Sequence, residues 1–282
     1  MNYEYIDTHT HVNLQAYKED WEEVIARTRA AGVAHINVGT QQDTSRRAVE
    51  MAEAYEDGVY AMVGLHPVHT DASYHDEKEF GPEQKGFTTR GEVFDTDYYR
   101  KLAGSEKVVA IGECGLDYYR ISPETKEKQD AAFIAQIELA NEVGKPLMLH
   151  IRPSDDPSAP NAYEDAYAII KKYAKVRGNA HFFAGTVEDA KKFWDVGYSV
   201  SFTGVITFTC DYDEVVQAAP KELIHAETDA PYVTPVPYRG KRNEPLHVRE
   251  VYKRIAQIRG EDEAALRAQL RTNAQHMYGI AL

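Results

Sequence analysis

Three residues near the amino terminus, Asp7, His9 and His11, are of types that bind metal ions or move protons. They alternate along a strand-like stretch, and alternate residues of a strand point to one face. Two imidazoles in this arrangement can reach a single ion, at about 2.0–2.1 Å for zinc. A His-x-His pair is also common among surface residues, so this segment alone leaves metal binding and a surface role open.

Five further residues of these types accompany predicted strands: His66, Glu113, His150, His181 and Asp229. Four of them end a strand-like run, and His181 lies within one. Six of the eight predicted strands therefore deliver a histidine or a carboxylate to the same end. Structural polar residues would instead be scattered over helices and both strand ends. The pattern indicates a functional site built from strand ends.

The potential ligands exceed what one tetrahedral zinc ion needs. The excess indicates two ions about 3.5–4 Å apart that share a carboxylate, and Glu113, central in strand order, is the expected bridge. The remaining ligands divide into His9, His11 and Asp229 for one ion and His150 and His181 for the other. A metal-bound hydroxide would attack the substrate, and Asp229 would orient the water and accept its proton. The expected catalytic residues are therefore Asp229 and Glu113.

Four other residues are expected to contact substrate: His66, Arg152, Arg239 and Lys241. His66 would hydrogen-bond to substrate or to a ligand rather than bind metal. Arg152 follows His150 by two positions, shares its face and could bind a phosphate bidentately, although an ion pair with a nearby aspartate is the alternative. Arg239 and Lys241 belong to a basic run after the last predicted strand, which suits phosphate contacts and a solvated loop equally.

Two residues beside these ligands are expected to be structural. Asp7 should lie deeper than His9 and support the ligands without binding metal. Cys114 adjoins Glu113 but, by strand alternation, should point away from the site and pack in the core.

Strand-like runs alternate with amphipathic helical patterns almost from end to end. Such alternation predicts parallel strands with right-handed crossovers. The predicted strands span 3–8, 34–38, 59–64, 108–112, 146–150, 180–183, 198–202 and 223–228. Eight repeats favour an α/β protein with a (β/α)8 barrel of TIM type and a metal site at the carboxyl-terminal mouth of its strands. An open doubly wound sheet competes, but no G-x-G-x-x-G turn or P-loop supports it.

One domain over residues 1–282 is expected, since about 250 residues suit such a barrel. Two connections, near 69–97 and 152–161, are long enough to be insertions at the mouth. The helix before Gly197 should open with a capping box of Thr186 and Asp189, and two helices near 248–258 and 263–278 should end the chain.

Composition restricts the class of protein further. A net charge of −13 argues against tight binding along a duplex, yet a metal site with a few local arginines can still attract phosphate. Cys114 and Cys210 are the only cysteines, which gives neither a disulfide framework nor a CxxC zinc pattern. No signal peptide and no apolar run of about 18 residues is recognisable, so a cytoplasmic protein without membrane contact is expected.

Together these segments closely resemble the TatD family of metal-dependent deoxyribonucleases, within the amidohydrolase-like barrels. The resemblance spans nearly the whole chain in the family's order and rests on Ile6–His11, Gly64–Pro67, Ala110–Tyr118, Leu149–Arg152, Glu227–Pro231 and Arg239–Pro245. It implies a TIM-type barrel, the six metal-site residues named above, and 3′–5′ exonuclease or related phosphodiesterase activity. Two departures put the choice of substrate in doubt: His181–Gly185 lacks the family's usual serine hydroxyl, and Cys114 replaces a more usual aliphatic or threonine residue.

The leading interpretation is a divalent-metal phosphodiesterase acting on nucleic acid ends, most simply on single-stranded DNA, with no obligate protein partner. Two divalent ions are expected as cofactors, and mixed histidine and carboxylate ligands accept Zn, Mn, Mg, Co or Ni. A hydrolase of C–N or lactone bonds could use the same site, and a barrel that binds metal without catalysis is the third interpretation. The basic residues near the mouth favour phosphate, and the intact Asp229 opposes a non-catalytic role.

Overall fold

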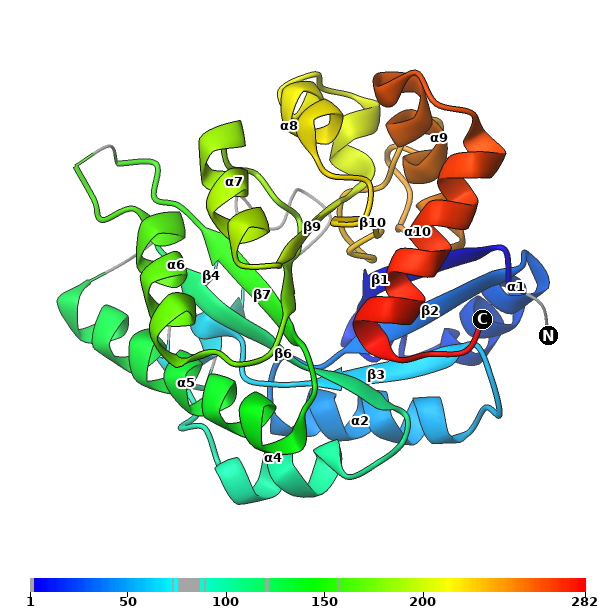
Figure 1. Ribbon diagram of the computed structural model, residues 1–282. Coiled ribbons are helices and arrows are strands. Elements are labelled where there is room, and N and C mark those ends of the chain that lie inside the picture. The colour runs from blue at the N-terminus through cyan, green and yellow to red at the C-terminus, as the bar shows by residue number, and fades with distance from the viewer. Residues whose placement is uncertain (1–2, 73, 76–86, 89, 120–121, 157) are drawn as a thin grey trace.

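The computed structural model describes residues 3–72, 74–75, 87–88, 90–119, 122–156 and 158–282. Its centre is a sheet of eight parallel strands that curls into a nearly closed barrel, with helices wrapped around the outside (Figure 1). The strands, in order around the barrel, are β1 (Tyr5–Thr10), β2 (Val33–Val38), β3 (Val59–Val63), β6 (Val108–Asp117), β7 (Leu147–Arg152), β8 (Gly178–Ala180), β9 (Ser199–Phe202) and β10 (Ile224–Ala226). The predicted (β/α)8 barrel is confirmed.

Helices connect the strands and cover their outer faces. They are α1 (Trp21–Ala30), α2 (Gln42–Glu53), α4 (Thr96–Ala103), α5 (Pro123–Val143), α6 (Ala162–Tyr173), α7 (Val187–Asp195), α8 (Asp213–Ala218), α9 (Val248–Arg259) and α10 (Glu263–Tyr278). The capping box expected before α7 is present, since Thr186 Oγ1 accepts from the Asp189 N–H and the Asp189 carboxylate accepts from Thr186. Among the described helices, none is long and apolar enough to cross a membrane.

Short 3₁₀ turns complete the connections. They are η1 (Gln15–Tyr17), η2 (Pro67–Thr70), η3 (Gly204–Thr207) and η4 (Pro245–His247). Both η2 and η3 follow the carboxyl end of a barrel strand, so both lie at the mouth.

Alternate residues of the strands face opposite sides of the barrel wall, and apolar side chains pack on both sides. One cluster packs between strands and helices, and a second joins the opposite faces of five neighbouring strands, with Ile6, Ile36 and Met62 among its members. The second cluster also contains Ala274 and Met277 of α10. The last part of α10 therefore packs with the interior cluster, whereas its first part, with Leu266 and Leu270, packs in the outer cluster.

The barrel closes between β1 and β10 without a regular ladder in the described residues. Instead, backbone bonds join the end of β1 to the segment that follows β10: the Asp229 N–H donates to the His9 carbonyl at 2.9 Å, and the His11 N–H donates to the Ala230 carbonyl at 2.8 Å. The buried carboxylate of Asp7 accepts from the Thr228 N–H at 2.9 Å and from the His9 N–H at 3.3 Å. Asp7 thus ties together the two segments that carry potential ligands.

Several predicted strand ends were wrong. β6 continues past Gly112 to Asp117, β7 continues past His150 to Arg152, and β8 ends at Ala180, so His181 follows this strand instead of lying within it. Polar side chains do not end a strand when the neighbouring strand continues to pair with its backbone, as β7 does along β6.

The connection near 69–97 contains part of η2 and a two-stranded antiparallel hairpin, β4 (Tyr74–His75) with β5 (Phe87–Thr88). Residues 73, 76–86 and 89 of this predicted insertion lie outside the described residues, as does residue 157 of the second predicted insertion near 152–161. The described part of the second connection leads from β7 to α6 without a further strand or helix.

Candidate metal centre

Two glycines of β6 allow the close approach that builds the site. Gly112 and Gly115 have φ values of +148° and +136°, and a Cβ atom on them would lie 2.4 Å from the Met148 carbonyl oxygen and 2.1 Å from that of His150. No side chain fits at such distances, so only glycine allows β6 and β7 to pair here. The result is that Glu113 of β6 lies beside His150 of β7.

Four side chains place one donor atom each around a common point. His9 Nε2 lies 3.1 Å from His11 Nε2 and 3.4 Å from Glu113 Oε2. His11 Nε2 lies 3.7 Å from Glu113 Oε2 and 3.4 Å from Asp229 Oδ1. His9 Nε2 and Asp229 Oδ1 are 3.8 Å apart. An ion with tetrahedral bonds of about 2.0–2.2 Å keeps its ligand atoms roughly 3.3–3.6 Å apart, so this first donor set fits a divalent ion.

The other oxygen of Glu113 faces a second donor set. Glu113 Oε1 lies 3.0 Å from His150 Nδ1 and 2.7 Å from His181 Nε2, and these two nitrogens are 3.5 Å apart. The 2.7 and 3.0 Å separations are hydrogen-bond distances, shorter than those between the ligand atoms of one ion, but the three atoms converge on one place and could hold a second ion after small shifts. Each oxygen of Glu113 therefore faces a different group of histidines, as a bridging carboxylate must.

His66 faces the same oxygen from a third side. Its Nε2 lies 3.3 Å from Glu113 Oε1, and its Nδ1 accepts the Val68 N–H at 3.2 Å. Because Nδ1 is occupied as an acceptor, the proton of the neutral ring is on Nε2, which can donate to Glu113. The structure thus places His66 against the carboxylate, and its donor atoms also group with those of Glu113 and His150.

Asp117 is a candidate site residue that was not expected from the sequence. Its Oδ2 accepts from His150 Nε2 at 2.8 Å, which leaves Nδ1 of that ring to face Glu113. Asp117 is 5% exposed, and Gln129 holds its backbone through two hydrogen bonds. A carboxylate behind a ligand histidine fixes its ring orientation and increases its basicity. The available signal was its spacing, since Asp117 follows Glu113 by four positions along one strand.

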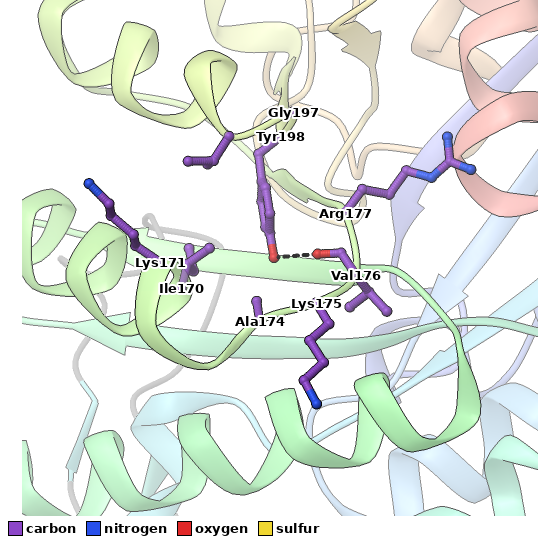
Figure 2. Close-up of a pocket in the computed structure, with 9 residues that line it drawn as sticks. Ile170, Lys171, Ala174, Lys175, Val176, Arg177, Gly197 and Tyr198 are labelled. Atoms are coloured by element: carbon purple, nitrogen blue, oxygen red, sulfur yellow. Dashed lines mark hydrogen bonds between the residues drawn. The ribbon is translucent and has the colours of Figure 1, made fainter.

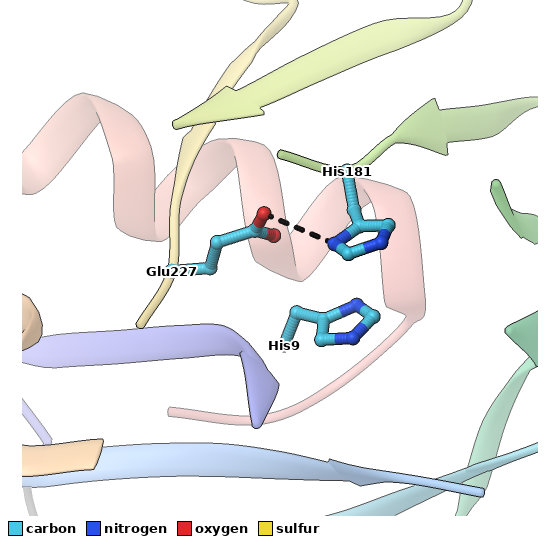
Figure 3. A group of neighbouring side chains, drawn as sticks. All are labelled: His9, His181 and Glu227. Atoms are coloured by element: carbon cyan, nitrogen blue, oxygen red, sulfur yellow. Dashed lines mark ion pairs between the residues drawn. The ribbon is translucent and has the colours of Figure 1, made fainter. Parts of the chain in front are cut away.

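Glu227 makes a similar contact behind His181 and was also missed. Its Oε1 lies 3.4 Å from His181 Nδ1 and accepts the Phe182 N–H at 2.6 Å, and Glu227 is wholly buried (Figure 3). The His9 ring stacks on the His181 ring, with centroids 3.9 Å apart. Glu227 precedes Asp229 by two positions, and this spacing was the signal available in the sequence.

The electrostatics of the site suit cations. Burial raises the pKa of Glu113, but His181, His66 and His9 outweigh it and hold the pKa well below its usual value, so this carboxylate is anionic. Burial, together with the positive charge of His181, lowers the pKa of His9 to about 3. His9 is therefore neutral and able to donate its lone pair to an ion at physiological pH.

The residues expected to contact substrate lie around this centre. Arg152 is half-buried, with Cζ 3.9 Å from the centroid of the Tyr119 ring, and its charge helps to lower the pKa of Asp117. Arg239 and Lys241 are exposed on the loop after β10. The third residue of the basic run, Arg242, instead pairs with Asp20.

A cavity of about 280 Å³ elsewhere on the barrel is a poor candidate for the functional site. Its lining comes from the ends of α6 and α7 and the connections into β8 and β9, at the amino-terminal end of the strands. Its three cations, Lys171, Lys175 and Arg177, point in different directions (Figure 2).

A (β/α)8 barrel whose mouth gathers four histidines and two carboxylates is the arrangement expected of a metal-dependent hydrolase. The chain belongs to the family described as TatD related DNase, whose sequence pattern matches residues 6–279. This confirms the resemblance and the enzyme class expected from the sequence.

Individual relatives cover nearly the whole chain. It is 37% identical over 279 residues to an uncharacterized metal-dependent hydrolase, YabD, of Bacillus subtilis, covering 97% of this chain and 98% of that one. It is 34% identical over 284 residues to the 3′-5′ ssDNA/RNA exonuclease TatD of Klebsiella pneumoniae, covering 95% and 96%. Among solved structures, the TatD homologue YjjV of Escherichia coli shares the fold with a TM-score of 0.81 at 24% identity, covering 100% of both chains.

Proposed function

We propose that this protein is a two-metal phosphodiesterase that removes nucleotides from the 3′ end of single-stranded nucleic acid. The observation that carries the proposal is the division of Glu113 between two donor sets, Oε2 towards His9 and His11 and Oε1 towards His150 and His181. Two-metal sites with a shared carboxylate are suited to in-line displacement at phosphorus. Polarity and substrate are taken from the relative in Klebsiella pneumoniae, which is named a 3′-5′ ssDNA/RNA exonuclease.

The two donor sets divide the chemical work. Divalent ions held by these residues would supply an activated water at neutral pH and would stabilise charge on the attacked phosphoryl group. Asp229 is the general base: Oδ1 belongs to the first donor set, and the strained backbone at this residue, with φ of +53°, fixes the direction of its carboxylate. Glu113, surrounded by five histidines, keeps the two positions at a fixed separation.

Cations near the mouth favour a phosphodiester over a neutral C–N or lactone bond. Arg152 shares the face of His150 at the end of β7, and Arg239 and Lys241 extend from the loop that follows β10. These are local positive charges on a chain of net charge −13, so they attract the substrate to one place. Arg152 is the residue best placed to bind the phosphate at the reacting end.

The test combines metal analysis with degradation of single strands labelled at the 5′ or the 3′ end. The protein should hold two ions per chain at saturation, release the 3′ label at once and shorten the 5′-labelled strand stepwise. Asp229→Asn should retain metal and lose at least about 10³-fold in kcat. Saturation at one ion, or a wild type that with full metal does not shorten single strands, would refute the proposal.

A further inference from the structure

Two large apolar side chains are exposed on neighbouring loops near the mouth. Phe208 and Val236 are each 44% exposed, and Val93 is the remaining exposed large apolar residue in the described part of the chain. Phe208 directly follows η3, after β9, and Val236 lies in the loop after β10. The Val236 N–H donates to Thr207 Oγ1 at 2.9 Å, which joins the two loops next to Phe208.

Arg239 completes this surface. Its guanidinium carbon lies 4.1 Å from the centroid of the Phe208 ring, and Nη1 donates to the Thr234 carbonyl at 2.9 Å. No carboxylate of the described residues pairs with Arg239 or with the nearby Lys241. An arginine over an exposed ring, without a counter-ion, provides a flat cationic and aromatic surface. We refer to Phe208, Val236 and Arg239 as the rim platform.

The loops beneath the rim platform are held rigidly. Gly204 contacts the turn after β10 so closely that a Cβ atom there would lie 2.3 Å from the Val233 carbonyl oxygen. Val233 has a positive φ of +52°, which is unfavourable for a β-branched residue and marks a backbone fixed by its surroundings. Thr234 Oγ1 also donates to the Lys241 carbonyl at 2.6 Å, which closes the loop on itself.

Chain continuity links the rim platform to the metal centre. The loop that carries Val236 and Arg239 starts at Asp229, a member of the first donor set. Tyr232, in the same loop, approaches the His11 ring with centroids 6.3 Å apart. The rim platform and the metal centre are therefore parts of one connected loop region at the mouth.

We propose that the rim platform stacks a base of the single-stranded substrate, at least one nucleotide away from the scissile bond. Bases stack on aromatic rings and on guanidinium planes without sequence preference, and a cation beside the ring attracts the neighbouring phosphate. An exposed apolar pair alone would suit many partners, but an arginine on its ring, with no carboxylate partner among the described residues, favours an anionic, aromatic one. This inference rests on the proposed nuclease function and adds a substrate contact outside the metal centre.

The experiment compares Phe208→Ala with wild type on two substrates, a 20-nucleotide single strand and bis(p-nitrophenyl) phosphate, which is too small to span both places. The quantity of interest is the factor by which kcat/KM falls on the strand divided by the factor on the small ester. We expect this ratio to be about ten, because stacking of one base contributes about that much to binding. Phe208→Tyr should keep the ratio near one, as in the wild type, and Phe208→Leu should give about the same ratio as Phe208→Ala. Tyr173→Ala is the matched control, since Tyr173 also has a cation on its ring, Lys172 at 4.8 Å, but ends α6 at the opposite end of the barrel.

A ratio near one, or equal losses for Phe208→Ala and Tyr173→Ala, would overturn the rim platform while leaving the nuclease function intact. Failure of the wild type to cleave the strand while it hydrolyses the small ester would remove both. Light scattering of the same variants covers the other possible occupant: if Phe208→Ala converts a dimer to a monomer, the surface is an interface between copies of this chain and the inference is wrong.

Discussion

Replacing Asp117 with asparagine should weaken one metal position and spare the other. Asp117 Oδ2 accepts the Nε2 proton of His150 at 2.8 Å, and this bond leaves Nδ1 directed at Glu113 Oε1, 3.0 Å away. At 5% exposure the carboxylate is shielded from solvent, so its charge acts on the ring with little screening. The first donor set does not include His150, and its geometry should remain unchanged.

The size of the effect follows from the bond that is changed. A hydrogen bond to a charged group contributes about 1.5–3 kcal/mol, which corresponds to about 10- to 150-fold in affinity. Asparagine keeps an acceptor oxygen but loses the charge, so Asp117→Asn should weaken the second ion about 10- to 30-fold. Asp117→Ala leaves the buried Nε2–H of His150 without a partner and should cost about 100-fold.

Competition titrations of the metal-free protein against a chelator, with Zn²⁺ and Mn²⁺ in turn, measure both affinities. Asp165→Asn is the control: this carboxylate accepts from the Tyr118 hydroxyl at 2.8 Å and pairs with Lys126 at 3.0 Å, so it loses the same charge near β6 without touching His150. Equal weakening of both ions in Asp117→Asn, or the same loss in Asp165→Asn, would show that orientation of His150 does not explain the second position.

Three further predictions concern stability, pH and thiol chemistry. Gly115→Ala should destabilise the protein by about 3 kcal/mol in denaturant titrations, because its Cβ atom would lie 2.1 Å from a β7 carbonyl oxygen, whereas Gly144→Ala, with φ of +67° and open space, should cost about 1 kcal/mol. Although burial lowers the pKa of His181, the neighbouring carboxylates raise it well above its usual value. The stability that this proton contributes is present below about pH 6.5 and is lost as pH rises through the raised pKa of His181. Added Zn²⁺ should therefore increase Tm more at about pH 8.5 than at about pH 6. Equal increases at the two pH values would contradict this. Burial raises the pKa of Cys114 while Cys210 is exposed, so a thiol reagent should modify one cysteine per native chain and both after unfolding.

The sequence alone determined the barrel and the types of residue at its mouth. Strand and helix periodicities are local properties of the chain, so all eight strands could be predicted although their ends could not. His9, His11 and Asp229 could be recognised from the sequence because residue types that bind metal seldom recur at strand ends unless they form a site. The structure brings their donor atoms within 3.8 Å of one another.

Tertiary structure decided which atom of each side chain faces which neighbour. The roles of Asp117 and Glu227 depend on the orientation of the His150 and His181 rings, and the two faces of Glu113 depend on the register of β6 against β7. The rim platform likewise joins residues from two loops that are distant in sequence. A sequence pattern specifies the kind of side chain at each position, but the direction of a ring nitrogen or a carboxylate oxygen is set by contacts between strands, which only the folded barrel provides.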